Sequence, residues 1–166
     1  MQLILQDDFR HAMRRLAASV NIVTCQKSGV WHGMTATAVT SLCLEPPSLL
    51  VCVNRTASFH AALCDAEMFC VNILGTQHLD VSNAFGRKVD NPAEKFTTGS
   101  WQADRTGSPF LVDAQSNVFC KVASVFSYGT HDIFVGVCES ILTADPDTPE
   151  LPLLYANGRY ASPACL

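Results

Sequence analysis

The sequence predicts a mainly β protein, in which antiparallel strands close into a barrel with short helices on its outside. Three observations lead to this fold class. Extended apolar runs dominate the chain, and no strand alternates with a helix of about 10–15 residues, as a doubly wound parallel sheet would require. No G-x-G-x-x-G follows a strand, which argues against a Rossmann dinucleotide site. With 166 residues, we expect one domain spanning 1–166.

Composition excludes several functional classes. A hydrophobic fraction of 48% with 16% charged residues is typical of a packed globular protein. The net charge is −4 and the 11 Lys and Arg are dispersed, which argues against a nucleic-acid partner. The longest apolar run, 48–54, is far shorter than the roughly 18 residues of a membrane span, so we expect no membrane association. The amino terminus turns acidic at once and is no secretory signal, so a cytoplasmic location is expected.

The first third of the chain changes from helical to extended periodicity. Apolar residues at 9, 12, 13 and 16 predict a helix over 9–17, capped by Asp7 and Asp8. A strand is predicted over 20–25, followed by a turn at 27–29 and a second extended run over 31–44. The prolines at 46 and 47 end that run, because neither can donate to a strand ladder.

The rest of the chain alternates strands with short helices. Strands are predicted over 48–53, 68–74, 118–128 and 131–142, with a turn at 129–130 between the last two. Short helices are predicted over 58–64, with Ser58 as the cap, and over 76–85. The segment 86–109 is predicted to be a polar, irregular loop with Trp101 as a lone anchor, and long loops of this kind are often functional.

Eight cysteines occupy mostly apolar runs and form no C-x-x-C pair, so we interpret them as core thiols of a reducing compartment. A redox or nucleophilic role stays open for any of them. No metal site is expected, because Cys and His do not cluster at zinc-ligand spacing. The cysteines are Cys25, Cys43, Cys52, Cys64, Cys70, Cys120, Cys138 and Cys165.

Two segments have the composition of a ligand site. The run 33–41 alternates small and hydroxyl residues, which would let a planar ligand lie against the backbone, although an ordinary Thr-rich strand reads the same way. The segment 54–58 leaves a strand and enters a helix with a cation and hydroxyls, which suits a phosphate, although a plain capped turn is the alternative.

Three further segments carry polar groups that could act in chemistry. Arg87 and Lys88 end a helix, where the helix dipole alone favours cations. His131 lies at the mouth of a strand, and Asp132 should point to the opposite face, so the two do not form a pair. Tyr155 and Arg159 lie in an aromatic segment near the end of the chain. No hydrolase motif is present.

The predicted strand over 118–128 is apolar on both faces, with Val118 and Cys120 on one side and Phe119 on the other. One face would fill the barrel, and the other must be covered by a helix or by a partner chain. This pattern favours a homodimer.

Taken together, these segments resemble the flavin reductase family, the small NAD(P)H:flavin oxidoreductase components of two-component monooxygenases. The resemblance runs from Phe9 to Tyr160. Its carriers, in chain order, are 33–38 with Ser41, Pro46 and Pro47, then 54–58, 69–74, Gln77, 82–85, 129–131 with Ile133 and Gly136, and finally Tyr155 with 158–160. Ala38 departs from the pattern, since many relatives have Ser there.

The resemblance implies a Greek-key, antiparallel split β-barrel of the FMN-binding type that dimerises and uses FMN or FAD with NADH or NADPH. It implies that His131 is the catalytic residue beside the nicotinamide or the reactive edge of the flavin. It assigns flavin binding to Met34, Thr35, Ala36, Thr37, Ala38, Ser41, Asn54, Arg55, Thr56, Ala57, Ser58, Arg87, Lys88, Tyr155 and Arg159.

The reaction implied is hydride transfer from the nicotinamide to the flavin, for which the protein supplies positioning. The expected role is to provide reduced flavin to a partner oxygenase. Two alternatives stay open at this point. The protein could retain FMN and reduce a quinone, a metal complex or a corrinoid, or it could be a non-catalytic flavin- or haem-binding barrel.

Overall fold

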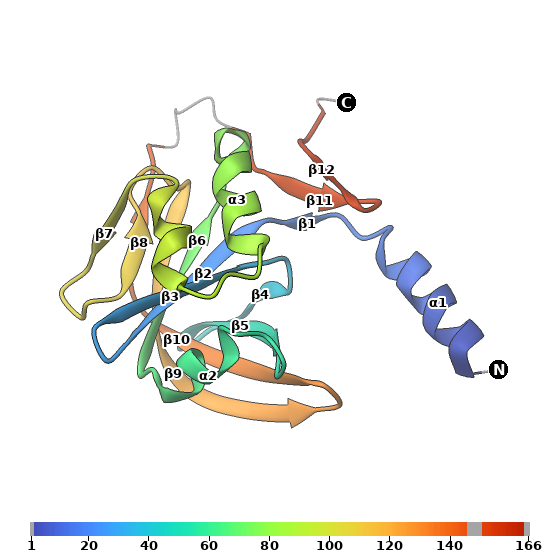
Figure 1. Ribbon diagram of the computed structural model, residues 1–166, viewed down its shortest axis with the longest axis horizontal. Coiled ribbons are helices and arrows are strands. Elements are labelled where there is room, and N and C mark those ends of the chain that lie inside the picture. Colours follow the sequence, from blue (N-terminus) through green and yellow to red (C-terminus); the bar gives the residue numbers. More distant parts are fainter. Residues whose placement is uncertain (1, 146–150, 165–166) are drawn as a thin grey trace.

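The structure is a computed structural model that describes residues 2–145 and 151–164 (Figure 1). Its centre is a seven-stranded sheet in the order β3-β2-β6-β9-β10-β5-β4, in which every neighbouring pair is antiparallel. The strands are β2 (Asn21–Lys27), β3 (Val30–Ala36), β4 (Val39–Leu44), β5 (Pro47–Asn54), β6 (Met68–Ile73), β9 (Ser116–Tyr128) and β10 (His131–Thr143).

The order of strands is a Greek key. Among the strands of this sheet, β5, β6, β9 and β10 follow one another along the chain, and β10 returns to lie beside β5. The two edge strands, β3 and β4, are joined by Thr37 and Ala38 alone. At this turn the Ala38 carbonyl accepts a hydrogen bond from Cys52 N at 3.0 Å. The sheet therefore curls until its edges meet, and the predicted split β-barrel is confirmed.

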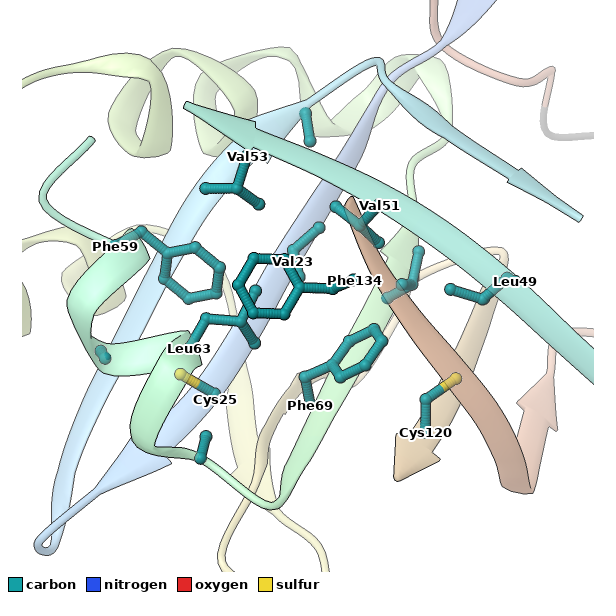
Figure 2. Close-up of a cluster of buried hydrophobic side chains, with 14 residues drawn as sticks. Val23, Cys25, Leu49, Val51, Val53, Phe59, Leu63, Phe69, Cys120 and Phe134 are labelled. Atoms are coloured by element: carbon teal, nitrogen blue, oxygen red, sulfur yellow. The ribbon is translucent and has the colours of Figure 1, made fainter. Parts of the chain in front are cut away.

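The inside of the barrel is filled by one apolar cluster to which β2, β5, β6, β9 and β10 all contribute (Figure 2). The helix α2 (His60–Asp65) closes it with Leu63, which is fully buried. Gly136 on β10 passes so close to the Phe69 ring that an added Cβ would lie 2.4 Å from Cζ. Only glycine fits there, because any side chain would displace the ring at the centre of the core.

The outer face of the sheet is covered by the segment between β6 and β9 (Figure 1). Phe85 packs there against both Phe96 and Trp101, with ring centroids 5.0 and 4.9 Å away. Trp101 is therefore part of an aromatic cluster rather than a lone anchor. The prediction of an irregular loop over 86–109 was wrong, because this segment contains a 3-10 helix and a short strand pair. The covering elements are η1 (Thr76–His78), α3 (Leu79–Gly86), η2 (Pro92–Thr97), β7 (Trp101–Ala103) and β8 (Pro109–Leu111).

Buried Asn72 on β6 anchors this covering layer. Its Oδ1 accepts hydrogen bonds from Leu111 N at 2.8 Å and Asn117 Nδ2 at 2.9 Å, and its Nδ2 donates to the Ile22 carbonyl at 2.8 Å. A buried amide that meets its partners is stabilising and specific in geometry. Asn72 thereby fixes β8 against the central sheet.

The remaining elements extend beyond the barrel. A small sheet combines β1 (Ala18–Ser19), β11 (Leu154–Ala156) and β12 (Arg159–Ala161). The helix α1 (Gln2–Met13) projects to one side (Figure 1). It begins before Asp7, whose carboxylate pairs with Arg10 at 2.9 Å within the helix, so Asp7 and Asp8 are not its cap. No helix in the described ranges is long and apolar enough to cross a membrane.

Three further sequence predictions need correction. The extended run 31–44 is two strands, because the chain turns at Thr37 to cross from one sheet edge to the other. The helix after β5 starts at His60, and no side chain caps it. The thiols of Cys43 and Cys64 are exposed, so these two are not core residues.

The core-thiol interpretation holds best for Cys25, Cys70 and Cys120, which are buried. Burial raises the pKa of the Cys25 and Cys120 thiols to about 12, so both stay protonated and unreactive near neutral pH. Cys52 and Cys138 are half-buried, and Cys165 lies outside the described residues.

Candidate functional site

A cleft of about 290 Å³ lies between β3, the loop that follows β5, and the end of α3. We call it the β3–α3 cleft. Seven of the residues predicted to bind flavin line it, and they come from three separate parts of the chain. These seven are Met34, Thr35, Thr56, Ala57, Ser58, Arg87 and Lys88, and the remaining lining residues are Phe59, Phe85, Gly86 and Lys95.

Lys95 joins the walls of this cleft. Its buried ammonium group donates to the Gly33 carbonyl of β3 at 3.2 Å and to the Phe85 carbonyl of α3 at 3.0 Å. Burial lowers the pKa of Lys95, because the charged form loses hydration. The cation therefore stays in place through these two hydrogen bonds, which hold β3, α3 and η2 at fixed positions.

The exposed edge of β3 faces this region. β3 is the last strand of the sheet, and it pairs with β2 on one side. The Gly33 carbonyl points away from β2 to reach Lys95. In an antiparallel ladder, residues two apart direct their backbone N–H and C=O groups to the same side, so those of Thr35 also point away from β2. Gly33 is required here, because an added Cβ would lie 2.6 Å from the Phe85 ring.

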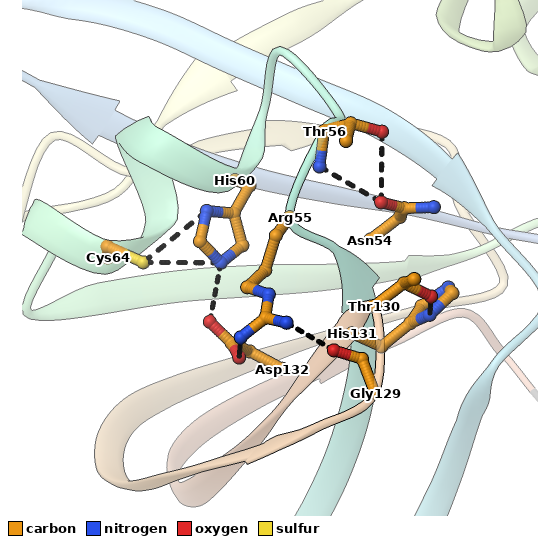
Figure 3. Close-up of polar contacts among 9 residues, drawn as sticks. All are labelled: Asn54, Arg55, Thr56, His60, Cys64, Gly129, Thr130, His131 and Asp132. Atoms are coloured by element: carbon orange, nitrogen blue, oxygen red, sulfur yellow. Dashed lines mark hydrogen bonds and ion pairs between the residues drawn. The ribbon is translucent and has the colours of Figure 1, made fainter.

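The loop 54–58 is held in a fixed turn. The Asn54 carboxamide oxygen accepts hydrogen bonds from Thr56 N and from Thr56 Oγ1, both at 2.9 Å (Figure 3). This side-chain turn directs Thr56, Ala57 and Ser58 toward the cleft, whereas Asn54 itself does not line it. Asn54 is therefore a residue that shapes the site through the loop.

Arg55 points to the other side of the loop, toward the β9–β10 turn (Figure 3). Its guanidinium donates to the Gly129 carbonyl and lies 4.0 Å from Asp132 Oδ1. His131 lies opposite Asn54 in the sheet register, is exposed, and its Nδ1 contacts Thr130 Oγ1 at 2.9 Å. The predicted catalytic histidine is therefore beside loop 54–58, at the rim of the site rather than inside the cleft.

Asp132 does have a histidine partner, although it is not His131. His60 Nε2 lies 2.7 Å from Asp132 Oδ2, and Cys64 Sγ lies 3.6 Å from the same ring nitrogen (Figure 3). Hydrogen bonds from Ser127 and then His60 lower the pKa of Asp132. Burial, followed by the charge of Asp132, raises the pKa of Cys64. The expectation that Cys and His do not cluster was therefore wrong.

The other predicted binding residues lie outside the cleft. Thr37, Ala38 and Tyr155 line a separate cavity of about 430 Å³ beneath α1. Ser41 lines a third, mainly apolar cavity of about 330 Å³, whose walls come mostly from β4, β5, β6, β9 and β10. The side chain of Ala36 is buried in the core, and exposed Arg159 lines none of these three cavities.

Two groups near the site were missed by sequence reasoning. Lys95 sits in the segment predicted to be irregular, and nothing local distinguishes a buried lysine from an exposed one. His60 and Cys64 had a usable signal, since positions four apart on a helix share one face. Their partner Asp132 is 72 positions from His60 and could come only from the fold.

The chemistry of the β3–α3 cleft suits a ligand that is planar at one end and anionic at the other. Met34, Phe59 and Phe85 supply apolar contact, and two exposed cations, Arg87 and Lys88, lie at the rim. Thr56 and Ser58 of loop 54–58 add hydroxyl groups to the lining. Such a combination of an apolar surface with a few placed polar groups is typical of cofactor sites.

Comparisons with known proteins agree with this description. The model of the flavin reductase like domain family matches residues 13–164. The chain is 41% identical to the reductase component of the FADH(2)-dependent resorcinol hydroxylase of Rhizobium sp., over 96% of this chain and 89% of that protein. It is 46% identical to FMN reductase (NADH) RutF of Pseudomonas syringae, over 92% of this chain and 83% of that protein.

A solved structure extends the similarity to the fold. The NADH:FAD oxidoreductase SgcE6 of Streptomyces globisporus, in complex with NAD and FAD fragments, superposes with a TM-score of 0.87. The two chains are 26% identical, and the match covers 96% of this chain and 93% of that one.

The role of Lys95 in holding the cleft gives the first prediction. Replacing Lys95 with Met should lower the free energy of unfolding by about 1–3 kcal/mol, because two buried carbonyls lose a charged donor. Lys88→Met removes an exposed lysine of the same cleft and should change it by less than about 0.5 kcal/mol. Urea unfolding of both variants measures the difference, and equal effects would contradict the role of Lys95.

Proposed function

Because this chain belongs to the flavin reductase like domain family, we propose that it catalyses the NADH-dependent reduction of FMN or FAD. The FMN reductase (NADH) and the hydroxylase reductase component described above support this, because each is similar to this chain over nearly its whole length. The observation that carries the proposal is the convergence of β3, loop 54–58 and the end of α3 on one cleft.

The residues of the cleft fit a flavin nucleotide. The β3 edge near Met34 and Thr35 would take the ring system, the hydroxyls of Thr56 and Ser58 would bind the ribityl chain, and Arg87 with Lys88 would bind the phosphate. When bound, the flavin supplies the redox chemistry by accepting the hydride of NADH. The protein's contribution is to hold the nicotinamide and the flavin ring against each other and to exclude water from between them.

We assign the nicotinamide side to His131. It projects from the β9–β10 turn beside loop 54–58, and its Nδ1 is engaged by Thr130, which leaves Nε2 free to face a substrate. A ring held in this way orients one substrate and needs no covalent step. Thr37, Ala38 and Tyr155 would contact the far side of the site from the neighbouring cavity. Arg159 pairs with Ala156, which lines the same cavity, and would join them from its edge.

The reduced flavin would pass to a partner monooxygenase, as the name of the resorcinol hydroxylase component indicates for that relative. The seven cysteines within the described residues are free thiols, which suits a reducing, cytoplasmic compartment.

We also propose that the protein is a homodimer. Large apolar side chains are exposed on α1, on β4 and on the tip of the β9–β10 hairpin. Both α1 and the hairpin tip point to the right in Figure 1. Exposed fractions reach 85% at Leu44, 59% at Phe126 and 64% at Phe9. Patches of this kind mark association surfaces.

The enzyme activity is tested by measuring NADH oxidation with purified protein, with and without added FMN or FAD. We expect turnover that requires added flavin. Oxidation by a retained flavin without any addition would favour a flavin prosthetic group and another acceptor. Absence of oxidation with either flavin would overturn the proposal and leave a binding protein.

The assignment of the phosphate gives a second prediction. The double variant Arg87→Gln with Lys88→Gln should weaken FMN binding about tenfold or more, because charged hydrogen bonds to the phosphate are lost. Its affinity for riboflavin, which has no phosphate, should stay the same. Fluorescence titration measures both ligands, and Arg105→Gln at an exposed distant turn is the control. Parallel losses for FMN and riboflavin would contradict the assignment.

A third prediction concerns His131. His131→Ala should lower kcat/KM for NADH about tenfold, the equivalent of one lost hydrogen bond, with little change in the dissociation constant of the flavin. Steady-state kinetics and flavin titration separate the two effects. His11→Ala, on the exposed face of α1, is the matched control. If NADH use and flavin binding fall equally, His131 does not serve the nicotinamide.

The dimer gives a fourth prediction. Phe126→Asp places a charge on the exposed hairpin tip and should convert a dimer to a monomer in sedimentation velocity at the same protein concentration. Val30→Asp alters an exposed apolar residue at the β2–β3 turn and should leave the dimer intact. A wild-type monomer, or dissociation by both variants, would contradict the proposed surface.

A further inference from the structure

A cluster of His60, Cys64 and Asp132 lies beside the β3–α3 cleft and shares no residue with it (Figure 3). His60 and Cys64 are one turn apart on α2, and Asp132 comes from β10. One ligand atom from each residue lies within 4.8 Å of the other two. The cluster therefore presents nitrogen, sulfur and oxygen donors to a single point.

The geometry differs from that of a Cys-His-Asp nucleophile. In such a triad the two ring nitrogens face different partners, so that one accepts the thiol proton while the other is held by the carboxylate. Here Nε2 is the ring nitrogen nearest to both, at 2.7 Å from Asp132 Oδ2 and 3.6 Å from Cys64 Sγ. Cys64 lies 3.8 Å from Nδ1. The thiol is thus almost equidistant from the two ring nitrogens, and the nearer one is already paired with Asp132. The three donor atoms instead lie within 4.8 Å of one another, a spacing that a shared metal ion can bridge.

The carboxylate of Asp132 is only partly satisfied. Its side chain is 9% exposed, and Oδ1 is buried without a hydrogen bond of ordinary geometry. The guanidinium of Arg55 faces Oδ1 at 4.0 Å, so Oδ2 is the oxygen directed at His60. The carboxylate therefore keeps Arg55 at one oxygen and offers the other, Oδ2, to the cluster.

We propose that His60 Nε2, Cys64 Sγ and Asp132 Oδ2 bind one Zn²⁺ ion, with water in the fourth position. Ligands in a tetrahedral zinc site lie roughly 3.3–3.7 Å apart, given zinc bonds of about 2.0–2.3 Å. The 3.6 Å between Cys64 and His60 already meets this. His60 changes tautomer through solvent, so that its hydrogen moves from Nε2 to Nδ1. Nε2 and Asp132 Oδ2 then exchange their mutual hydrogen bond for two bonds to the metal, and Cys64 releases its thiol proton to solvent.

The ion would connect two elements that border the proposed flavin site. α2 follows directly from loop 54–58, and Asp132 is adjacent to His131 on β10. Zinc at this point ties the loop to the hairpin that carries His131. Exposure of Cys64 gives the ion a path from solvent, so no rearrangement of the core is needed for entry.

The test uses Co²⁺ as a spectroscopic probe of the full-length protein, because thiolate coordination produces a sulfur-to-cobalt charge-transfer absorption in the near ultraviolet. We expect this absorption in wild type, its displacement by one equivalent of Zn²⁺, and its loss in Cys64→Ser. By competition with a chromophoric chelator, Cys64→Ser should weaken Zn²⁺ binding by at least about tenfold. Cys43→Ser, which removes an exposed thiol outside the cluster, should retain wild-type behaviour.

Two results would overturn the proposal. Wild-type protein that shows no thiolate absorption with Co²⁺ would reduce the cluster to a His–Asp ion pair with a neighbouring thiol. Equal absorption in wild type and Cys64→Ser would place the bound metal elsewhere. Circular dichroism of Cys64→Ser confirms folding, and because the thiol is exposed the substitution disturbs no core packing. None of these readouts depends on flavin reduction.

Discussion

The ammonium group of Lys95 holds together three segments, β3, the end of α3 and η2. Its hydrogen bonds to the Gly33 and Phe85 carbonyls fix the edge of β3 against the end of α3. The side chains that line the β3–α3 cleft depend on that spacing, since Met34 and Thr35 follow Gly33 and Arg87 follows Phe85. Burying a lysine costs hydration free energy. The hydrogen bonds from the ammonium group to the two buried carbonyls offset this cost.

The barrel explains why such a contact is available. A sheet that is apolar on both faces must be covered twice, and here the inner face closes on itself while the outer face receives α3, η2 and the β7–β8 hairpin. That outer layer carries Lys95 to β3 and is anchored by Asn72 at its far end. The flavin site we propose therefore forms where the outer layer meets an unpaired sheet edge, which offers free peptide groups to a ligand.

The strands and the fold class could be predicted from the sequence, because hydrophobic periodicity and turn residues are properties of short stretches of chain. The β9–β10 hairpin followed from Gly129 and Thr130, and β5 from its apolar run. The division of 31–44 into two strands could not be read in this way, since the turn at Thr37 is set by closure of the barrel.

The site shows the same division between local and tertiary information. The segments that meet in the β3–α3 cleft were recognised through the resemblance to a family, and the structure brings seven of their residues together. The burial of Lys95 and the pairing of His60 with Asp132 depend on contacts between distant parts of the chain. Neither could be predicted from a local sequence pattern.

The central claim, that a flavin nucleotide binds in the β3–α3 cleft, is tested most directly by a crystal structure of the protein with FMN. The account predicts the phosphate within hydrogen-bond distance of Arg87 or Lys88, with the ring system against the β3 edge at Met34 and Thr35. FMN bound with its phosphate remote from both cations, for example in the cavity beneath α1, would contradict it.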